Sequence, residues 1–225
     1  MSGQLTFGPE IDGLLDELHA RSGGQEEALG AYFSARAAEG SMDWNRFDDR
    51  TNRFLADKLV ALDREKGEFC HQICRALGAR RVVEAGTSYG VSTMYLAAAV
   101  RDNGGGVVIA TENEPEKAAA ARMNWERVGL SPFIDLREGD LRETLREPGG
   151  PIDFLLIDIW TPMAEPALAL VAPRLRIGAV VVCDNTAMFR DAYSDYFAFV
   201  NDPAHGLSTM TLPFSGGLEF TVRVR

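Results

Sequence analysis

The sequence lacks the features that define several classes of protein. In its 225 residues no apolar run reaches the roughly 18 residues that a membrane span needs. The residues from Met1 to Gln4 have neither the basic nor the apolar region of an export signal, so a cytoplasmic protein with no membrane partner is expected. Basic residues number 23 against 33 acidic ones, and the formal net charge is -10. Binding to nucleic acid through its phosphates is therefore not expected.

Cysteine is also scarce. Of the three cysteines, Cys70 and Cys74 share one face of a predicted helix, and Cys183 lies in a strand-like run. This spacing matches no metal-binding motif, and free buried thiols are expected. With 46% apolar residues, the chain is long enough for one packed domain and short for two, so we expect a single domain over residues 1–225.

The pattern of apolar residues divides the chain into a helical part, 1–79, and an alternating part, 80–225. Helical spacing predicts helices over 11–20 and 26–38, a third from near Asp48, and a fourth that carries Phe69, Ile73 and Leu77. Beyond Arg80, short apolar runs alternate with helical stretches, which is typical of a parallel sheet with crossover helices.

The predicted fold class is α/β, a doubly wound, Rossmann-like sheet of about seven mostly parallel strands. Five parallel strands are predicted at 81–85, 107–111, 133–137, 153–157 and 179–183. Helices are predicted at 92–100, 116–128 and 162–175, the last distorted by Pro166 and Pro173. The alternation over 209–212 and 218–225, around a Ser-Gly-Gly turn, predicts a terminal antiparallel hairpin. The first 79 residues are predicted to form an N-terminal helical cap.

The stretch from Val82 to Thr93 predicts a strand that turns through Gly86 and Gly90 into a helix. Such a turn brings backbone N–H groups and a helix N-terminus toward an anionic ligand. The dinucleotide fingerprint needs a third glycine that this loop lacks, and no Tyr-x-x-x-Lys pair supports a nicotinamide oxidoreductase. A cofactor that carries a carboxylate and no phosphate fits better.

Acidic residues stand at the carboxyl end of each predicted parallel strand, where ligands bind in open sheets. They are Glu84, Glu112, Asp140, Asp158 and Asp184, the last followed by Asn185. Strand ends also favour Asp and Asn because these residues form turns, but five together favour a binding rim. Glu112, 22 residues past Gly90, is placed to accept hydrogen bonds from two ribose hydroxyls, or it is a solvated acid. Ser92 binds a cofactor carboxylate or caps its helix.

Several motifs in order resemble the class I S-adenosylmethionine (SAM)-dependent O-methyltransferases of the metal-dependent catechol and caffeoyl-CoA type. The resemblance runs from Lys66 to the C-terminus and includes Lys66-Gly67-Glu68-Phe69, the glycine loop, Glu138-Gly139-Asp140, 153–158 and Cys183-Asp184-Asn185. It implies a set of residues that bind SAM. Gly86, Thr87 and Ser92 would surround the methionine end, Glu112 would hold the ribose, and Asp140 and Leu141 would flank the adenine. Glu84, Gly90 and Asp158 complete the predicted cofactor-binding residues.

The resemblance also implies a divalent metal at Asp158, Asp184 and Asn185, with Asp158 as the catalytic residue. Two carboxylates and an amide oxygen form a hard oxygen site suited to Mg²⁺, Mn²⁺ or Ca²⁺. The alternative is an Asp-Asn turn that leaves the fifth strand without a metal.

The sequence departs from the family pattern at one position that bears on catalysis. Relatives carry a lysine three residues after the strand-four Asp, and this chain has Thr161 there, although Trp160 matches the catechol enzymes. A histidine could replace the lysine as a base, and His205 is the first candidate, but a surface or packing role without catalytic duty is favoured for His19, His71 and His205 alike. We expect transfer of the SAM methyl group to a hydroxyl of a small-molecule acceptor, with a divalent metal, in a homodimer. Metal-independent N- or O-methylation and a binding protein without turnover are the alternatives.

Overall fold

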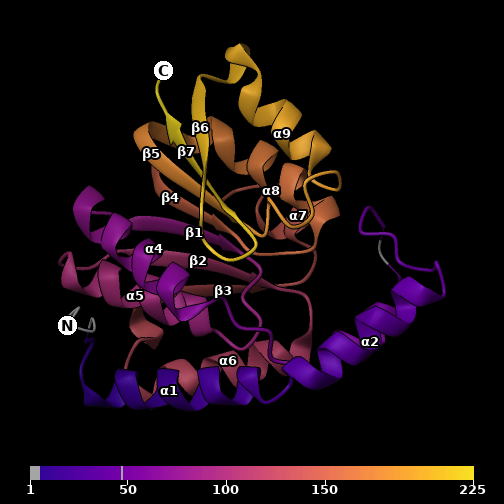
Figure 1. Ribbon diagram of the computed structural model, residues 1–225. Helices are drawn as coiled ribbons and strands as arrows, with labels where there is room; N and C mark the ends of the chain where they lie inside the picture. Colours follow the sequence, from indigo (N-terminus) through magenta and orange to yellow (C-terminus); the bar gives the residue numbers. More distant parts are fainter. Residues whose placement is uncertain (1–5, 47) are drawn as a thin grey trace.

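The computed structural model describes residues 6–46 and 48–225. Within this part of the chain, seven strands form one sheet in the order β3-β2-β1-β4-β5-β7-β6 (Figure 1). The strands are β1 (Arg81–Ala85), β2 (Val107–Glu112), β3 (Ile134–Glu138), β4 (Ile152–Ile157), β5 (Leu175–Asp184), β6 (Leu207–Leu212) and β7 (Leu218–Arg223). Strands β1 to β5 pair in parallel, and β7 pairs antiparallel to both β5 and β6. The predicted fold class is confirmed.

Helices cover both faces of the sheet. They are α1 (Pro9–Gly23), α2 (Glu26–Ala38), α3 (Asp49–Leu55), α4 (Arg64–Leu77), α5 (Val91–Asp102), α6 (Pro115–Arg127), α7 (Leu141–Thr144), α8 (Ala164–Val171) and α9 (Ser194–Asn201). Single 3₁₀ turns are η1 (Ser131–Phe133), η2 (Thr161–Met163), η3 (Ala172–Arg174) and η4 (Pro203–His205). Among the described residues, no helix combines the length and apolarity that crossing a bilayer requires.

Two apolar cores lie on opposite faces of the sheet because side chains alternate along each strand. In β1, Val82 packs with residues of α1, α4, α5 and α6, whereas Val83 and Ala85 pack with α7, α8 and α9. Cys70, Cys74 and Cys183 are free and buried in these cores, as expected. Glu84 shares the face of Val82, so its carboxylate is directed into the layer of α5.

The prediction of one helix over 162–175 was partly wrong. This stretch divides into η2, α8 and η3, and residue 175 already belongs to β5, which begins four residues before the predicted strand. Pro166 lies in the first turn of α8, where its missing N–H has no helical partner to lose, so it does not interrupt that helix. Pro173 lies in η3, past the end of α8.

Helices α4 and α5 pack closely, and this contact joins the helical first third to the sheet. A Cβ on Gly67 would lie 2.6 Å from Cε2 of Tyr95, so a glycine is needed where α4 crosses that ring. Tyr95 is fully buried, its hydroxyl lies 2.9 Å from His19 Nε2, and its carbonyl oxygen lies 3.0 Å from His71 Nδ1. His19 and His71 therefore have packing roles.

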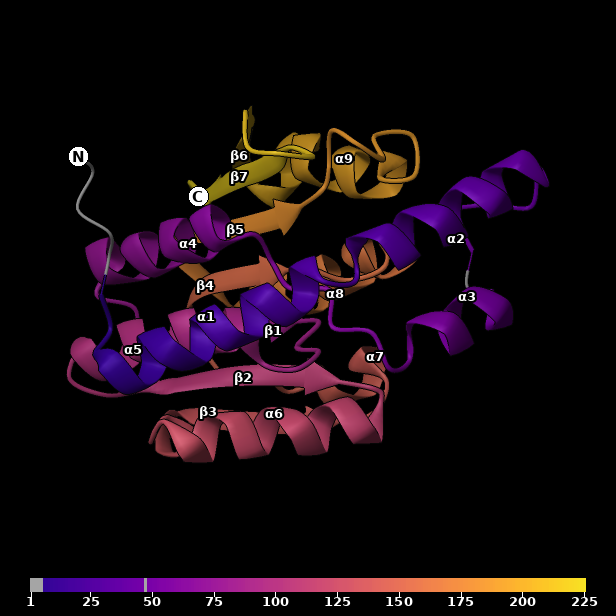
Figure 2. The same cartoon turned by 60° about the horizontal axis from the view of Figure 1, so that its bottom comes forward.

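Helices α2 and α3 form an arm that projects beyond the body of the sheet (Figures 1 and 2). Helix α1 buries a row of four apolar residues, but in α2 the buried residue is Arg36, whose guanidinium pairs with Asp48 at 2.7 Å. Tyr32 and Phe54 stack with ring centroids 3.8 Å apart and join the two helices of the arm. The predicted helical cap thus has a packed part, α1 and α4, and a projecting part, the arm.

Candidate active site

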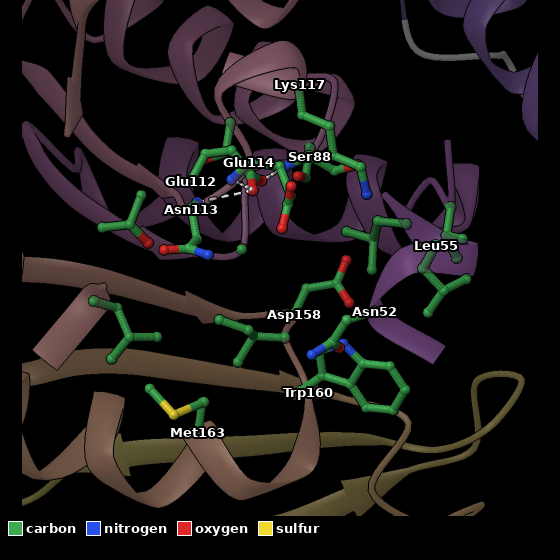
Figure 3. Close-up of a pocket in the computed structure, with 18 of the residues that line it drawn as sticks. Asn52, Leu55, Ser88, Glu112, Asn113, Glu114, Lys117, Asp158, Trp160 and Met163 are labelled. Atoms are coloured by element: carbon green, nitrogen blue, oxygen red, sulfur yellow. Dashed lines mark hydrogen bonds between the residues drawn. The ribbon is translucent and has the colours of Figure 1, made fainter. Parts of the chain in front are cut away.

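A cavity of about 560 Å³ opens at the carboxyl ends of the parallel strands (Figure 3). Its wall includes eight of the predicted site residues, namely Gly86, Thr87, Ser92, Glu112, Asp140, Leu141, Asp158 and Asn185. Glu84, Gly90 and Asp184 do not line the cavity in this structure, and Glu84 lies directly behind Thr87, to which it is hydrogen-bonded. The arm contributes Phe33, Asn52 and Leu55, so the cavity lies between the sheet and the arm.

Glu84 is a fully buried carboxylate with one free oxygen. Its Oε2 accepts hydrogen bonds from Thr87 Oγ1 at 2.8 Å and from Thr93 Oγ1 at 2.5 Å. The Ser92 hydroxyl also lies beside this carboxylate, but Oε1 has no hydrogen-bond partner of good geometry among the described residues. Burial raises the pKa of Glu84 to about 7, against the opposing effect of the hydroxyl hydrogen bonds. Burying an ionised carboxylate with an unpaired oxygen costs free energy, and a cationic group of a ligand would offset this cost by pairing with it.

The two glycines of the loop are explained by packing within the protein. A Cβ on Gly86 (φ +96°) would collide with the carbonyl oxygen of Asp158, and one on Gly90 (φ +81°) would collide with the indole of Trp125. The Trp125 Nε1–H donates to the Gly90 carbonyl oxygen at 3.0 Å and fixes the loop on α6. The sequence interpretation assigned both glycines to ligand approach, and Trp125 was not anticipated.

Glu112, the last residue of β2, is held rigidly at the cavity edge (Figure 3). Its Oε2 accepts the N–H of Ser88 at 2.6 Å, and its Oε1 accepts those of Asn113 and Glu114, both at 2.8 Å. A carboxylate offers about four acceptor positions, so capacity remains after these three bonds. About one position therefore stays open, so two ribose hydroxyls would have to share it or displace a backbone N–H, and the ribose role of Glu112 stays a prediction. In this structure Glu112 ties the glycine loop to β2.

Asp140 is already paired in this structure. It caps α7 by accepting the N–H of Arg142 at 2.9 Å, and its carboxylate also forms an ion pair with the Arg142 guanidinium. The neighbouring Leu141 is buried and lines the cavity. An adenine at this position would therefore contact Leu141 directly, whereas a bond to Asp140 would compete with Arg142.

Asp158 lies on the cavity wall between the strand-end side and the aromatic side (Figure 3). Its N–H donates to the Ala85 carbonyl oxygen at 3.0 Å, which places it directly beyond β4. Figure 3 shows its carboxylate between Glu112 and Ser88 on one side and Trp160 on the other. Burial, followed by the nearby charges of Asp184 and Glu84, raises the pKa of Asp158 well above its ordinary value.

The predicted metal ligands do not form a free oxygen site. Asp184 Oδ1 lies 2.6 Å from Nζ of Lys66, and its Oδ2 accepts a hydrogen bond from Asn185 Nδ2 at 3.2 Å. Both carboxylate oxygens of Asp184 are thus engaged, which does not fit a divalent cation in this arrangement. Across residues 6–46 and 48–225, no cluster of three or more His, Cys, Asp or Glu side chains suits a metal ion. The metal stays a prediction from the resemblance.

Aromatic side chains form the end of the cavity that faces the arm. The ring centroid of Trp44 lies 4.2 Å from that of Phe189, 5.7 Å from that of Trp160 and 5.3 Å from that of Phe33. The Thr161 hydroxyl donates to the Trp44 carbonyl oxygen and so fastens this wall to η2. Thr161, at the position of the family lysine, is therefore a structural contact, and Trp44 and Trp160 both line the cavity.

His205 does not supply the missing base. Its ring stacks on Phe199 with centroids 3.7 Å apart, and its Nδ1 lies 2.8 Å from the Phe199 carbonyl oxygen. Both residues lie at the end of the sheet near β6, and neither belongs to the cavity wall.

Comparison with known proteins agrees with this geometry. Residues 83–186 match the model of a family described as a methyltransferase domain. A catechol O-methyltransferase of Mycobacterium tuberculosis is 30% identical over 79% of this chain and 71% of its own length. A catechol O-methyltransferase of Niastella koreensis is 31% identical over 56% of this chain and 58% of its own length. The solved O-methyltransferase of Bacillus cereus in complex with SAH superposes with a TM-score of 0.67 at 23% identity, covering 77% of this chain and 87% of the other.

The sheet order and the cleft at its strand ends define a Rossmann-like methyltransferase. More particularly, the chain belongs to the class I SAM-dependent O-methyltransferases, the family of the catechol O-methyltransferase that it matches over more than two thirds of that protein's length.

Proposed function

We propose that this enzyme transfers the methyl group of SAM to a hydroxyl oxygen of a small aromatic molecule, with a catechol as the model acceptor. One arrangement carries the proposal: Glu112 and Ser88 of the cavity wall lie on one side of Asp158, and the aromatic wall around Trp44 and Trp160 lies on the other (Figure 3). The two relatives are both named catechol O-methyltransferases, and these names support a hydroxyl as the methyl-accepting group and an aromatic ring as the body of the acceptor.

The residues on the cofactor side fit SAM group by group. Bound SAM would supply a methyl carbon made electrophilic by the sulfonium. Glu84 lies behind the wall residues Thr87 and Ser92, and once these side chains shift on binding, its Oε1 would accept a hydrogen bond from the cofactor ammonium, which supplies the positive charge that this buried carboxylate lacks. Thr87 and Ser92 would bind the cofactor carboxylate, Glu112 the ribose, and Leu141 the adenine face. The cavity of about 560 Å³ is of the size usual for a bound cofactor and ligand.

On the acceptor side, the protein positions an oxygen and keeps water away from it. The rings of Trp44, Trp160 and Phe189 would hold the acceptor ring by stacking. Asp158 would accept the hydroxyl proton as the new C–O bond forms and the C–S bond breaks. Holding the oxygen in line with the methyl group is the main catalytic contribution in this scheme. No step runs through a metal, because Asp184 is paired with Lys66.

A methyl-transfer assay tests the proposal. The protein is incubated with SAM and either catechol or 1,2-diaminobenzene, which has the same ring with amines in place of hydroxyls, and the products are separated by mass. We expect the methyl ether from catechol and little product from the amine. Methylation of the amine alone would favour the N-methyltransferase alternative, and SAM binding without product from any acceptor would favour a binding protein.

Two further expectations come from the family resemblance and the sequence. We propose that the enzyme is a homodimer and that it works in the cytoplasm. Sedimentation equilibrium tests the first, with a mass of twice 24.6 kDa as the expected result. Fractionation of cells that express the protein tests the second.

A further inference from the structure

Lys66 is a buried charged residue that the proposed reaction leaves unused. It lies in the first turn of α4, and its side chain is 2% exposed. Its ammonium group lies 2.6 Å from Asp184 Oδ1 and 3.1 Å from Asp63 Oδ2, so it joins the end of β5 to the start of α4. Buried lysines are rare unless paired, so this ion pair requires an explanation.

The position of Lys66 is fixed by the packing of its own helix. The next residue, Gly67, lies against the ring of Tyr95, and any side chain there would force α4 outward. This close contact sets the register of α4 and directs the Lys66 side chain beneath the strand ends. The carboxylates of Asp184 and Asp63 lie 2.6 Å and 3.1 Å from the Lys66 ammonium, and opposite charges this close favour the charged form of a lysine. The lysine is therefore a fixed positive charge.

This charge lies where a divalent cation would have to bind. Asp184 and Asp158 are the two carboxylates available for such an ion, and the Lys66 ammonium already contacts the first of them. A cation that binds both carboxylates must either displace the ammonium or lie close to it, and like charges at such distances repel strongly in a buried site. The remaining oxygen of Asp184 is paired with Asn185.

We propose that the Lys66 ammonium is the built-in cation of this site, so that Lys66 and a divalent cation compete for the Asp184 carboxylate. Lys66 is a positioning residue, because it acts on Asp184 and does not line the cavity. The proposal rests on the proposed function for the reaction that takes place beside this pair. The competition itself is measured with the cation alone, so it is tested whether or not a methyl acceptor is found.

Titration with Mn²⁺, followed by electron paramagnetic resonance, tests the competition. We compare the wild-type protein with Lys66→Gln, Lys66→Arg and a matched control, Lys58→Gln, whose lysine pairs with Asp57 away from Asp184. We expect weak Mn²⁺ binding by the wild-type protein, at least tenfold tighter binding by Lys66→Gln, and no change for Lys66→Arg and Lys58→Gln. Tight binding by the wild type together with equal or weaker binding by Lys66→Gln would overturn the proposal.

Two further measurements keep the test decisive if Lys66→Gln does not fold. The double variant Lys66→Gln/Asp184→Asn removes both charges of the buried pair, and circular dichroism is expected to show a native fold without a gain in Mn²⁺ affinity. Tighter Mn²⁺ binding by this double variant than by the wild type would contradict the role of Asp184. The second measurement uses the wild-type protein alone and compares its methyl-transfer activity with and without EDTA. Activity that EDTA leaves unchanged supports the built-in cation, whereas complete loss of activity that Mn²⁺ restores contradicts it.

Discussion

The two sides of the cavity are built in different ways. The cofactor side consists of strand ends and the glycine loop, where Glu84 is fully buried and Glu112 is held by three backbone N–H groups. The acceptor side depends on the projecting arm, whose aromatic rings are partly exposed and whose loop is fastened to η2 by the Thr161 hydroxyl. A rigid sheet edge suits a constant methyl donor, and a separately attached arm can vary with the acceptor without disturbing the sheet.

The largest effect is expected at Asp158, where the two sides meet. Asp158→Asn keeps the size of the side chain but removes the carboxylate that accepts the hydroxyl proton, so kcat should fall by about 10²- to 10⁴-fold. Steady-state kinetics with catechol measures the loss, and titration with S-adenosylhomocysteine (SAH) serves as the control. SAH affinity should change far less than kcat, and equal losses in both would place Asp158 on the cofactor side.

The next effect isolates the cofactor side. Glu84→Gln removes the buried charge that is left without a partner at Oε1, so SAH should bind roughly 10- to 100-fold more weakly, as is typical when a charged hydrogen bond is lost. Calorimetry measures the change, and Glu114→Gln, a nearby acid on the cavity wall, is the matched control. An unchanged SAH affinity in Glu84→Gln would show that the ammonium binds elsewhere.

The pH dependence of cofactor binding sharpens the same assignment. Because burial raises the pKa of Glu84 from 4.5 to about 7, the free protein carries this side chain protonated below that pH and ionised above it. Binding of a cationic ammonium requires the ionised form, so SAH affinity should fall by up to about tenfold per pH unit between pH 7 and pH 5.5. Glu84→Gln should lose this slope, and a wild-type affinity that stays level across this range would contradict the assignment.

The smallest expected effect isolates the acceptor side. Trp44→Ala removes one ring from the aromatic wall, and the KM for catechol should rise by roughly 2- to 12-fold, the range of one aromatic pair contact. SAH affinity should stay the same, since Trp44 belongs to the arm. A drop in SAH affinity comparable to the rise in KM would mean that the two sides are not independent.

The cofactor side was largely predictable from sequence, whereas the acceptor side was not. Strand ends, the glycine loop and Glu112 follow from short-range patterns that place polar residues at one edge of a parallel sheet. The contact of Thr161 with Trp44 joins residues 117 apart in sequence, and the pairing of Lys66 with Asp184 joins α4 to β5, so local periodicity contains no signal for either. The Lys66-Gly67 dipeptide was noticed as a motif, but its meaning depends on Tyr95, on another helix.

Local chemistry also accounts for two smaller differences. The bond from Arg142 to Asp140 is a short-range helix cap, which the Asp-x-Arg order is enough to suggest. The early start of β5 could not be seen, because residues 175–178 include an arginine and a glycine and so lack the unbroken apolar character of residues 179–183.

A crystal structure of the enzyme with SAH and catechol tests the central claim most directly, since it locates both ligands relative to Asp158. The account predicts the SAH ammonium at Glu84 Oε1, its ribose at Glu112, and a catechol oxygen facing Asp158 with the ring against Trp44 and Trp160. SAH bound with its ammonium away from Glu84, or catechol bound outside the cavity between sheet and arm, would contradict it.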